Sequence, residues 1–238
     1  MDLSQYPVYL FDLDGVITPT ADVHMLAWGE MFNSYLTAIG GQAPYTDADY
    51  YKFVDGKPRY NGVRDFLASR GIELPEGKPT DDPSQESVCG LGNRKNEAFN
   101  LIIERDGVAA YPGSVALIER LVADGAALAV VSSSKNAPAV LRAADLIEHF
   151  RVIVDGNVAR EQRLPGKPAP DTFAYAARQL GVTPDQCVVL EDALSGVAAG
   201  AAGEFGLVVG VDRGVGRQAL ADAGADIVVS DPSELMGE

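Results

Sequence analysis

Residues 8–15 of the chain read VYLFDLDG, so that Asp12 and Asp14 come directly after a short apolar run. The run does not alternate between polar and apolar residues, which is typical of a strand covered on both faces of a parallel sheet. In open sheets of this kind, ligands bind at the carboxyl ends of the strands. Asp12 and Asp14 therefore mark a candidate site at one edge of a predicted sheet.

Further short apolar runs follow this one, and helical patterns separate them, for example at residues 114–124, 137–145, 171–181 and 196–202. Such alternation predicts an α/β fold with a doubly wound parallel sheet and right-handed crossovers. The predicted strands are Val8–Leu13, Ala127–Val131, Val152–Val154, Val188–Leu190, Leu207–Val211 and Ile227–Val229.

One segment interrupts this rhythm. Residues 18–108 contain no convincing strand, although helical patterns recur in them at 21–39, 47–54, 63–70 and 94–105. We therefore predict an all-helical domain, 18–108, inserted into a core domain made of residues 1–17 and 109–238. The acidic, proline-containing stretch EGKPTDDPSQES, residues 76–87, predicts a loop within the insertion.

The chain has 238 residues and carries 19 Lys and Arg against 34 Asp and Glu, a formal net charge of −15. This charge repels nucleic acid and anionic lipid, so we expect neither as a partner. No apolar run approaches the roughly 20 residues that span a bilayer, and no signal peptide is recognisable at the start. Cys187 opens an apolar run and Cys89 has no motif around it. We therefore expect a cytoplasmic protein without a disulfide framework, and a monomer.

Four polar clusters are expected to converge in the fold. Three of them follow predicted strands: the aspartates at 12 and 14, the stretch Ser132–Asn136, and the pair Glu191 and Asp192. The fourth, Gly166-Lys167-Pro168, precedes a predicted helix after a longer loop. Because the carboxyl ends of parallel strands meet at one edge of a sheet, the four carboxylates should surround one small volume.

Such a cluster of carboxylates needs positive charge. Two carboxylates about 4 Å apart repel each other by roughly 4 kcal/mol at an effective dielectric constant near 20, so all four cannot stay ionised without a cation or shifted pKa values. Oxygen ligands suit Mg²⁺, whereas two histidines in the whole chain cannot form a His-rich zinc site. We predict a Mg²⁺ site with Lys167 as a second positive charge; its candidate ligands are Asp12, Asp14, Glu191 and Asp192.

Each cluster also has a simpler explanation when it is taken alone. An aspartate at a strand end can cap a turn, Glu191 and Asp192 can belong to a solvated loop, and Ser132–Asn136 can be the N-cap region of the next helix. Their shared position in the predicted topology favours a site. Two competing phosphate motifs, G-x-x-x-x-G-K-[ST] and a G-x-G-x-x-G after the first strand, are absent.

The ordered motifs FDLDGVIT (11–18), VVSSSKN (130–136), GKPAPD (166–171) and EDALSG (191–196) resemble those of the haloacid dehalogenase-like superfamily. The resemblance implies a Rossmann-like core with an inserted helical cap domain. It implies that Asp12 is a nucleophile that forms an aspartyl-phosphate and that Asp14 is the general acid and base. Ser132 and Lys167 would bind the transferred phosphoryl group. Mg²⁺ would be held by Asp12, Asp192 and the backbone carbonyl of Asp14, with Glu191 as a further ligand or a support.

The predicted cap domain is most similar to that of sugar-phosphate mutases within the superfamily. Its matching motifs are T-x-x-x-H-x-x-x-W, G-x-x-R and R-K-N. The resemblance implies that Arg59, with Ser134, Lys135 and Asn136, binds a second phosphate, and that His24 supports Asp14, with Lys95 as an intermediary. His24 could equally be a packing residue, Arg59 a surface ion-pair partner and Trp28 part of the cap core. The candidate substrate-binding residues are Thr20, Trp28, Gly56, Arg59, Lys95, Ser134, Lys135 and Asn136.

Two departures from the family pattern leave the reaction open. Pro19 replaces an aspartate that often follows the first motif, and the 76–87 loop is longer than a minimal cap requires. Cap closure excludes water and so decides whether a phosphoryl group passes to a sugar or to water. The sequence is therefore compatible with a mutase, with a sugar-phosphate phosphatase and with a non-catalytic phosphosugar-binding module.

Overall fold

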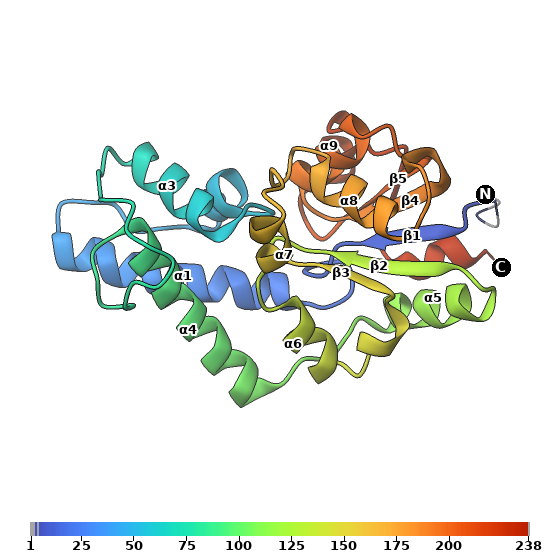
Figure 1. The fold of residues 1–238 in the computed structure, drawn as a ribbon. Coiled ribbons are helices and arrows are strands. Elements are labelled where there is room, and N and C mark those ends of the chain that lie inside the picture. Colours follow the sequence, from blue (N-terminus) through green and yellow to red (C-terminus); the bar gives the residue numbers. More distant parts are fainter. Residues whose placement is uncertain (1–2, 4, 238) are drawn as a thin grey trace. The chain divides into compact units, whose positions relative to one another are not determined.

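The computed structural model describes residue 3 and residues 5–237 (Figure 1). The chain divides into two compact units. The sheet unit comprises the described residues of Met1–Thr20 and Val108–Glu238, and the helical unit comprises Ala21–Gly107. Among the described residues, no helix combines the length and the apolar character needed to cross a bilayer.

The sheet unit is built on a six-stranded parallel sheet with the strand order β3-β2-β1-β4-β5-β6, which confirms the predicted doubly wound fold. Strand β1 lies at its centre, between β2 and β4. The strands are β1 Val8–Phe11, β2 Ala127–Val131, β3 Val152–Val154, β4 Cys187–Glu191, β5 Leu207–Val211 and β6 Ile227–Val229.

Helices cover both faces of this sheet (Figure 1). On one face, Phe173 of α8 and Val197 of α9 pack against Leu10 and Val189 in a single buried cluster, which also contains Cys187. The helices of this unit are α5 Pro112–Ala123, α6 Ala137–Ala143, α7 Gly156–Glu161, α8 Asp171–Gln179, α9 Leu194–Ala202 and α10 Arg217–Asp222, with 3₁₀ turns at Ile147–His149, Pro184–Gln186 and Pro232–Met236.

The helical unit has its own aromatic core. The ring of Phe32 lies with its centroid 4.2 Å from that of Phe66 and 5.0 Å from that of Tyr45. Trp28 stacks on Phe32 at 5.3 Å and is buried. The elements of this unit are α1 Thr20–Ile39, which begins at the last residue of the sheet unit, α2 Asp47–Asp49, a π-helical turn Tyr50–Val54, α3 Arg59–Ser69 and α4 Val88–Asp106.

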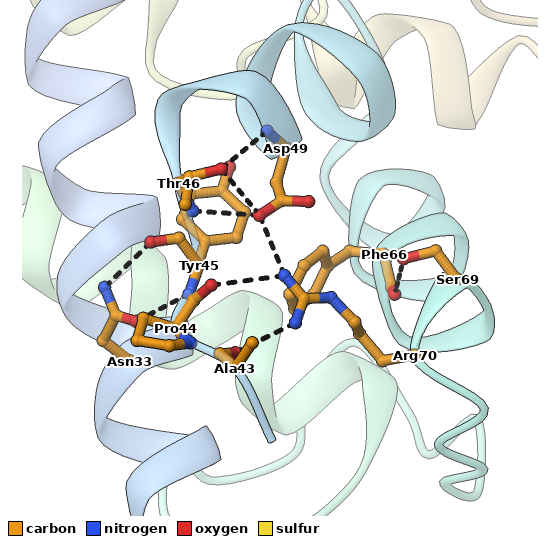
Figure 2. Close-up of polar contacts among 9 residues, drawn as sticks. All are labelled: Asn33, Ala43, Pro44, Tyr45, Thr46, Asp49, Phe66, Ser69 and Arg70. Atoms are coloured by element: carbon orange, nitrogen blue, oxygen red, sulfur yellow. Dashed lines mark hydrogen bonds and ion pairs between the residues drawn. The ribbon is translucent and has the colours of Figure 1, made fainter.

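Figure 2 shows how Arg70 holds the connection between α1 and α2. Its guanidinium donates hydrogen bonds to the carbonyls of Ala43 and Pro44 and lies 2.9 Å from the carboxylate of Asp49. On the other side of this connection, the backbone N–H of Tyr45 donates to Oδ1 of Asn33 at 2.8 Å. Side chains from two helices therefore fix a segment that has no regular structure of its own.

Helix α4 begins at Val88, six residues before the helical pattern indicated, because the hydroxyl of Ser87 accepts a hydrogen bond from the N–H of Gly90 at 2.9 Å. The first five residues of this helix include Gly90 and Gly92, so they show no apolar period in the sequence. Between α3 and α4 the chain contains no helix or strand, and residues 76–87 form a loop as predicted.

Candidate active site

The ends of β1 and β4 bring three of the predicted acidic residues together. The N–H of Asp12, just after β1, donates to the carbonyl of Leu190 in β4 at 2.9 Å, which sets the two strand ends level. Carboxylate oxygens of Asp12, Glu191 and Asp192 lie within 4.8 Å of one another. All three side chains are largely buried. Convergence at the carboxyl edge, which the topology predicts, therefore occurs for these residues.

Lys167 enters this cluster from the loop before α8. Its Nζ lies 2.5 Å from Oδ1 of Asp12 and 2.5 Å from Oε1 of Glu191, and it donates to the carbonyl of Val131 at 3.0 Å. The side chain is buried, and the ring of Phe173 lies 5.0 Å from Nζ. The lysine thus links the ends of β1, β2 and β4.

The electrostatics of the cluster are unbalanced. Burial raises the pKa of Asp12; the Lys167 ammonium opposes this, but Glu191 and Asp14 add to it, and the pKa lies well above its usual range. Burial lowers the pKa of Lys167, yet Asp12 and Glu191 raise it above its ordinary value, so the amine stays charged. One lysine among these carboxylates leaves negative charge uncompensated, which a divalent cation would neutralise.

Gly15 keeps the space beside this cluster open. A Cβ at position 15 would lie 1.8 Å from Oδ2 of Asp192, and the glycine has a φ of +81°. The backbone of Gly15 therefore lies too close to the carboxylate of Asp192 for any side chain to fit at position 15. Opposite ligands of an octahedral Mg²⁺ are about 4 Å apart, so oxygen atoms at the observed spacing need little movement to hold one. The donor set, all oxygen, fits such an ion.

Asp14 is half-buried and is oriented by hydroxyl groups. Thr20 Oγ1 donates to Oδ1 of Asp14, and the hydroxyls of Thr18 and Thr20 are 2.7 Å apart. Ser132 Oγ lies 3.5 Å from Oδ2 of Asp14. The motif match predicts that Thr20 binds the substrate. In the structure its hydroxyl contacts Asp14, a predicted catalytic carboxylate.

The loop after β2 carries Ser132, Ser134, Lys135 and Asn136. Its backbone is folded on its own hydroxyls: the N–H of Ser134 donates to Ser132 Oγ at 3.1 Å, and that of Asn136 to Ser134 Oγ at 3.2 Å. Asn136 precedes α6 but makes no side-chain cap. The side chain of Asn136 therefore does not cap α6, although the hydroxyl of Ser134 accepts an N–H directly before that helix.

Three residues that support the site were not predicted from the sequence. Arg213 donates from Nε to the carbonyl of Gly15 at 2.7 Å, and its guanidinium carbon lies 3.8 Å from the ring centre of Tyr111. Asn157 donates to the carbonyl of Lys135 at 3.3 Å, and Asp155 caps α7 beside it. Arg213 and Asn157 reach backbone carbonyls, so no pairing of residue types in the sequence could have indicated them.

In the helical unit, His24 and Lys95 are in direct contact through Nδ1 and Nζ. The ring of His24 stacks on Phe99 with centroids 4.1 Å apart, and Nζ of the buried Lys95 lies 4.8 Å from the Phe99 centroid. Trp28 lies in the aromatic core, which favours the packing interpretation over a substrate platform.

Arg59, the first residue of α3, donates from Nη2 to Oδ1 of Asn96 in α4 at 2.5 Å. Burial lowers the pKa of its guanidinium, and the Tyr60 side chain opposes this change. Gly56 has a φ of +67°, which a glycine adopts without strain, in the turn that precedes α3. The arginine is thus a structured group of the helical unit, and its described contact with Asn96 is not a surface ion pair.

Comparisons with known proteins identify the family of this chain. The family described as haloacid dehalogenase-like hydrolase matches residues 6–203. The chain belongs to this family. It is 48% identical over 237 residues to the β-phosphoglucomutase of Mycobacterium bovis, a match that covers 95% of this chain and 90% of the relative.

Solved structures agree with the family assignment. CbbY from Rhodobacter sphaeroides in complex with phosphate aligns with a TM-score of 0.74 at 25% identity, over 97% of this chain and 96% of that one. β-Phosphoglucomutase from Clostridium difficile aligns with a TM-score of 0.78 at 25% identity, over 97% and 93% of the two chains. This haloacid dehalogenase-like protein is an enzyme of the phosphotransferase or phosphatase type.

Proposed function

We propose that this enzyme is a Mg²⁺-dependent β-phosphoglucomutase, which converts β-glucose 1-phosphate into glucose 6-phosphate through a bisphosphate. The observation that carries the proposal is the pairing of Asp12 with Lys167 inside a cluster of three carboxylates. A sugar phosphate as substrate is supported by the 48% identity to a curated β-phosphoglucomutase.

In the first half-reaction, a carboxylate oxygen of Asp12 attacks the phosphorus of the bisphosphate and the sugar oxygen leaves. Asp14, held by the Thr20 hydroxyl, donates a proton to that oxygen. In the second half-reaction, Asp14 takes a proton from a hydroxyl of the substrate β-glucose 1-phosphate, and that oxygen attacks the phosphorus of the aspartyl-phosphate, which forms the bisphosphate again and regenerates Asp12. Ser132 and Lys167 stabilise the charge on the transferred phosphoryl group.

Asp12, Asp192 and the backbone carbonyl of Asp14 are the proposed Mg²⁺ ligands. When bound, the ion would supply the positive charge that the carboxylates and the phosphoryl oxygens require. Glu191 is better suited to support than to ligation, since it is paired with Lys167 and accepts a hydrogen bond from the N–H of Ala193 at 3.2 Å. We assign it the task of holding the lysine in place.

The second phosphate of the bisphosphate needs its own site. We assign this task to Arg59 of the helical unit together with Ser134, Lys135 and Asn136 of the sheet unit. The backbone of the Ser134–Asn136 segment is fixed by hydroxyl groups and by Asn157, which would reduce the entropy lost on binding an anion. His24 and Lys95, in contact with each other, are proposed to support Asp14.

A sugar-phosphate phosphatase is the second candidate. It would use the same nucleophile, with water as the final acceptor. One observation favours it: the structure aligns with that of CbbY from Rhodobacter sphaeroides in complex with xylulose-(1,5)bisphosphate, with a TM-score of 0.76. A non-catalytic binding module is less well supported, because binding alone does not require the buried pair of Asp12 and Lys167.

The deciding experiment supplies the purified enzyme with β-glucose 1-phosphate, Mg²⁺ and a trace of glucose 1,6-bisphosphate, and measures glucose 6-phosphate and inorganic phosphate together. We expect glucose 6-phosphate to form in large excess over phosphate, and its formation to depend on the bisphosphate. Steady release of phosphate without glucose 6-phosphate would instead establish the phosphatase. Binding without either product would contradict both the mutase and the phosphatase assignments for this substrate.

We also propose that the enzyme is a cytoplasmic monomer. Both cysteines, Cys89 and Cys187, are buried thiols and form no disulfide with each other, as is usual for proteins in a reducing compartment. Light scattering of the purified protein would test the oligomeric state, and a dimer at micromolar concentration would contradict it.

A further inference from the structure

Two side chains of α4 contact the loop of residues 76–87: that of Arg94, whose Nε donates to the carbonyl of Pro83 at 2.8 Å, and that of Asn93. Its Nδ2 donates to the backbone carbonyl of Asp81 at 2.8 Å and to that of Pro79 at 3.1 Å. The acidic side chains of the loop take no part in these two bonds. The loop therefore contacts α4 through its backbone carbonyls, which its acidic composition does not indicate.

These two bonds fix the orientation of the Asn93 amide. Backbone carbonyls can only accept hydrogen bonds, so the NH₂ group must face the loop and Oδ1 must face the other way. On that side, the hydroxyl of Tyr60 in α3 donates to Oδ1 of Asn93 at 2.9 Å. The phenolic proton is thereby committed to Asn93, and the lone pairs of the Tyr60 oxygen are left to accept from a neighbouring donor.

Arg59 is that neighbour: burial lowers the pKa of its guanidinium, and a hydrogen bond with the Tyr60 side chain opposes this change. Helix α4 lies close to α3 at this point. A Cβ on Gly92 would lie 2.8 Å from Cδ1 of Tyr60 and 3.1 Å from Cδ of Arg59. One turn further along α4, Asn96 accepts from Nη2 of Arg59 at 2.5 Å. The arginine is thus packed on a glycine and bonded by the next turn of the same helix.

We propose that Tyr60 and Asn93 are positioning residues for Arg59, and that the 76–87 loop orients this arginine for the distal phosphate through the carbonyls of Pro79 and Asp81. The inference rests on the proposed function, which assigns Arg59 to that phosphate. A guanidinium held in advance loses less side-chain entropy when it binds an anion. The long loop is then part of the substrate-recognition machinery of the helical unit, and its length is explained.

The test uses Tyr60→Phe and Asn93→Leu in the full-length enzyme. Each substitution removes a hydrogen-bonding group from the series of contacts that links the loop to Arg59, and each keeps the approximate volume of the side chain. We expect each to raise the KM for glucose 1,6-bisphosphate about tenfold, the effect of losing one hydrogen bond to a charged group or its support. We expect kcat to change less than about twofold, because the reacting atoms are untouched. Hydrolysis of p-nitrophenyl phosphate, which lacks a second phosphate, should not change.

Arg64→Gln is the matched control. Arg64 also lies on α3 and also contacts the loop region, with Nε 2.9 Å from Oε2 of Glu76, but this ion pair is exposed. Exposed pairs contribute little, so the KM for the bisphosphate should stay unchanged in this variant. A rise equal to that of Tyr60→Phe would show that any loosening of the loop has the same effect, and would overturn the specific route through Asn93.

The same substitutions in an Arg59→Ala background separate positioning from a general structural role. If Tyr60 and Asn93 act through Arg59, neither substitution should raise the KM further once the arginine is gone. A further rise of the same size in that background would overturn the inference. A drop in thermal unfolding temperature that accompanies equal losses in both assays would also overturn it.

Failure of the inference can be told from failure of the proposed function. If Arg59→Ala raises the KM for the bisphosphate at least tenfold and Tyr60→Phe and Asn93→Leu do not, the distal-phosphate role stands and the positioning route is wrong. If Arg59→Ala leaves the KM unchanged, the assignment of Arg59 to the distal phosphate is wrong, and the inference falls with it.

Discussion

In the sheet unit, the candidate residues stand at the ends of neighbouring strands, whereas in the helical unit Arg59 is bonded to a side chain of a second helix, α4. Backbone pairing aligns β1 with β4 residue by residue, so Asp12 and Glu191 must lie close together whatever their side chains do. No comparable rule places Arg59 beside Asn96, which is 37 residues further along the chain. A regular backbone thus positions the chemistry of one unit, and individual side-chain contacts position that of the other.

Asp12→Asn should have the largest effect of the changes considered, because it removes the nucleophile and leaves the strand ends in place. We expect turnover of β-glucose 1-phosphate to fall by about 10⁴-fold or more. Thermal unfolding should remain a single cooperative transition near that of the wild type, since the amide can still accept a hydrogen bond from Lys167. Normal turnover in this variant would remove the assigned mechanism and, with it, the view that the strand edge carries the chemistry.

The sequence predicts the sheet unit well for the same physical reason. The six strands are predicted from buried apolar runs, and polar residues follow several of them directly. The topology of a parallel sheet then brings Asp12 and Asp192 together. Lys167 was predicted with less support, because a long loop precedes it, and it too reaches Asp12. The residues missed in this unit, such as Arg213, bind backbone carbonyls, which every residue of the chain possesses.

The helical unit shows where prediction from the sequence stops. The motif match indicated Arg59, but neither Tyr60 nor Asn93 was singled out, since their contacts depend on the path of the 76–87 loop. That loop has no regular structure and no period in its sequence. The acidic composition of the loop indicates a role for its side chains, whereas its backbone carbonyls make the contacts with Asn93.

Gly15→Ala tests how closely the backbone controls the sheet-unit site. The added Cβ would meet Oδ2 of Asp192 at 1.8 Å, so either the turn or this carboxylate must move. A displacement of about 1 Å at a catalytic group can cost on the order of 10²-fold in rate, and we expect a loss of that size. Turnover and calorimetric titration with Mg²⁺ would be measured, with weaker Mg²⁺ binding expected.

Gly125→Ala is the matched control for this change. Gly125 has nearly the same φ, +83°, but no atom lies within 4 Å of its would-be Cβ. It therefore carries the backbone strain without the clash, and should cost about 1 kcal/mol of stability with unchanged turnover. If Gly15→Ala behaved like Gly125→Ala, the close approach of the backbone to Asp192 would have no functional meaning.

Arg70→Met should have the smallest effect, and it is confined to the helical unit. The substitution removes the hydrogen bonds to Ala43 and Pro44 and leaves the partly buried Asp49 carboxylate without its ion pair. We expect the free energy of unfolding to fall by about 1–2 kcal/mol. Trp28 is the single tryptophan of the chain and lies in the helical core, so its fluorescence during denaturation by urea reports on this unit.

The control for Arg70→Met is Arg120→Gln in the sheet unit, which breaks an ion pair with Asp124 in which both side chains are more than half exposed. Such a pair contributes at most about 0.5 kcal/mol, so the denaturation midpoint should hardly move. Equal midpoints for wild type and Arg70→Met would show that the α1–α2 connection is held by packing alone. A shift with Arg70→Met only would show that discrete side-chain contacts stabilise the helical unit, as they are proposed to position its arginine.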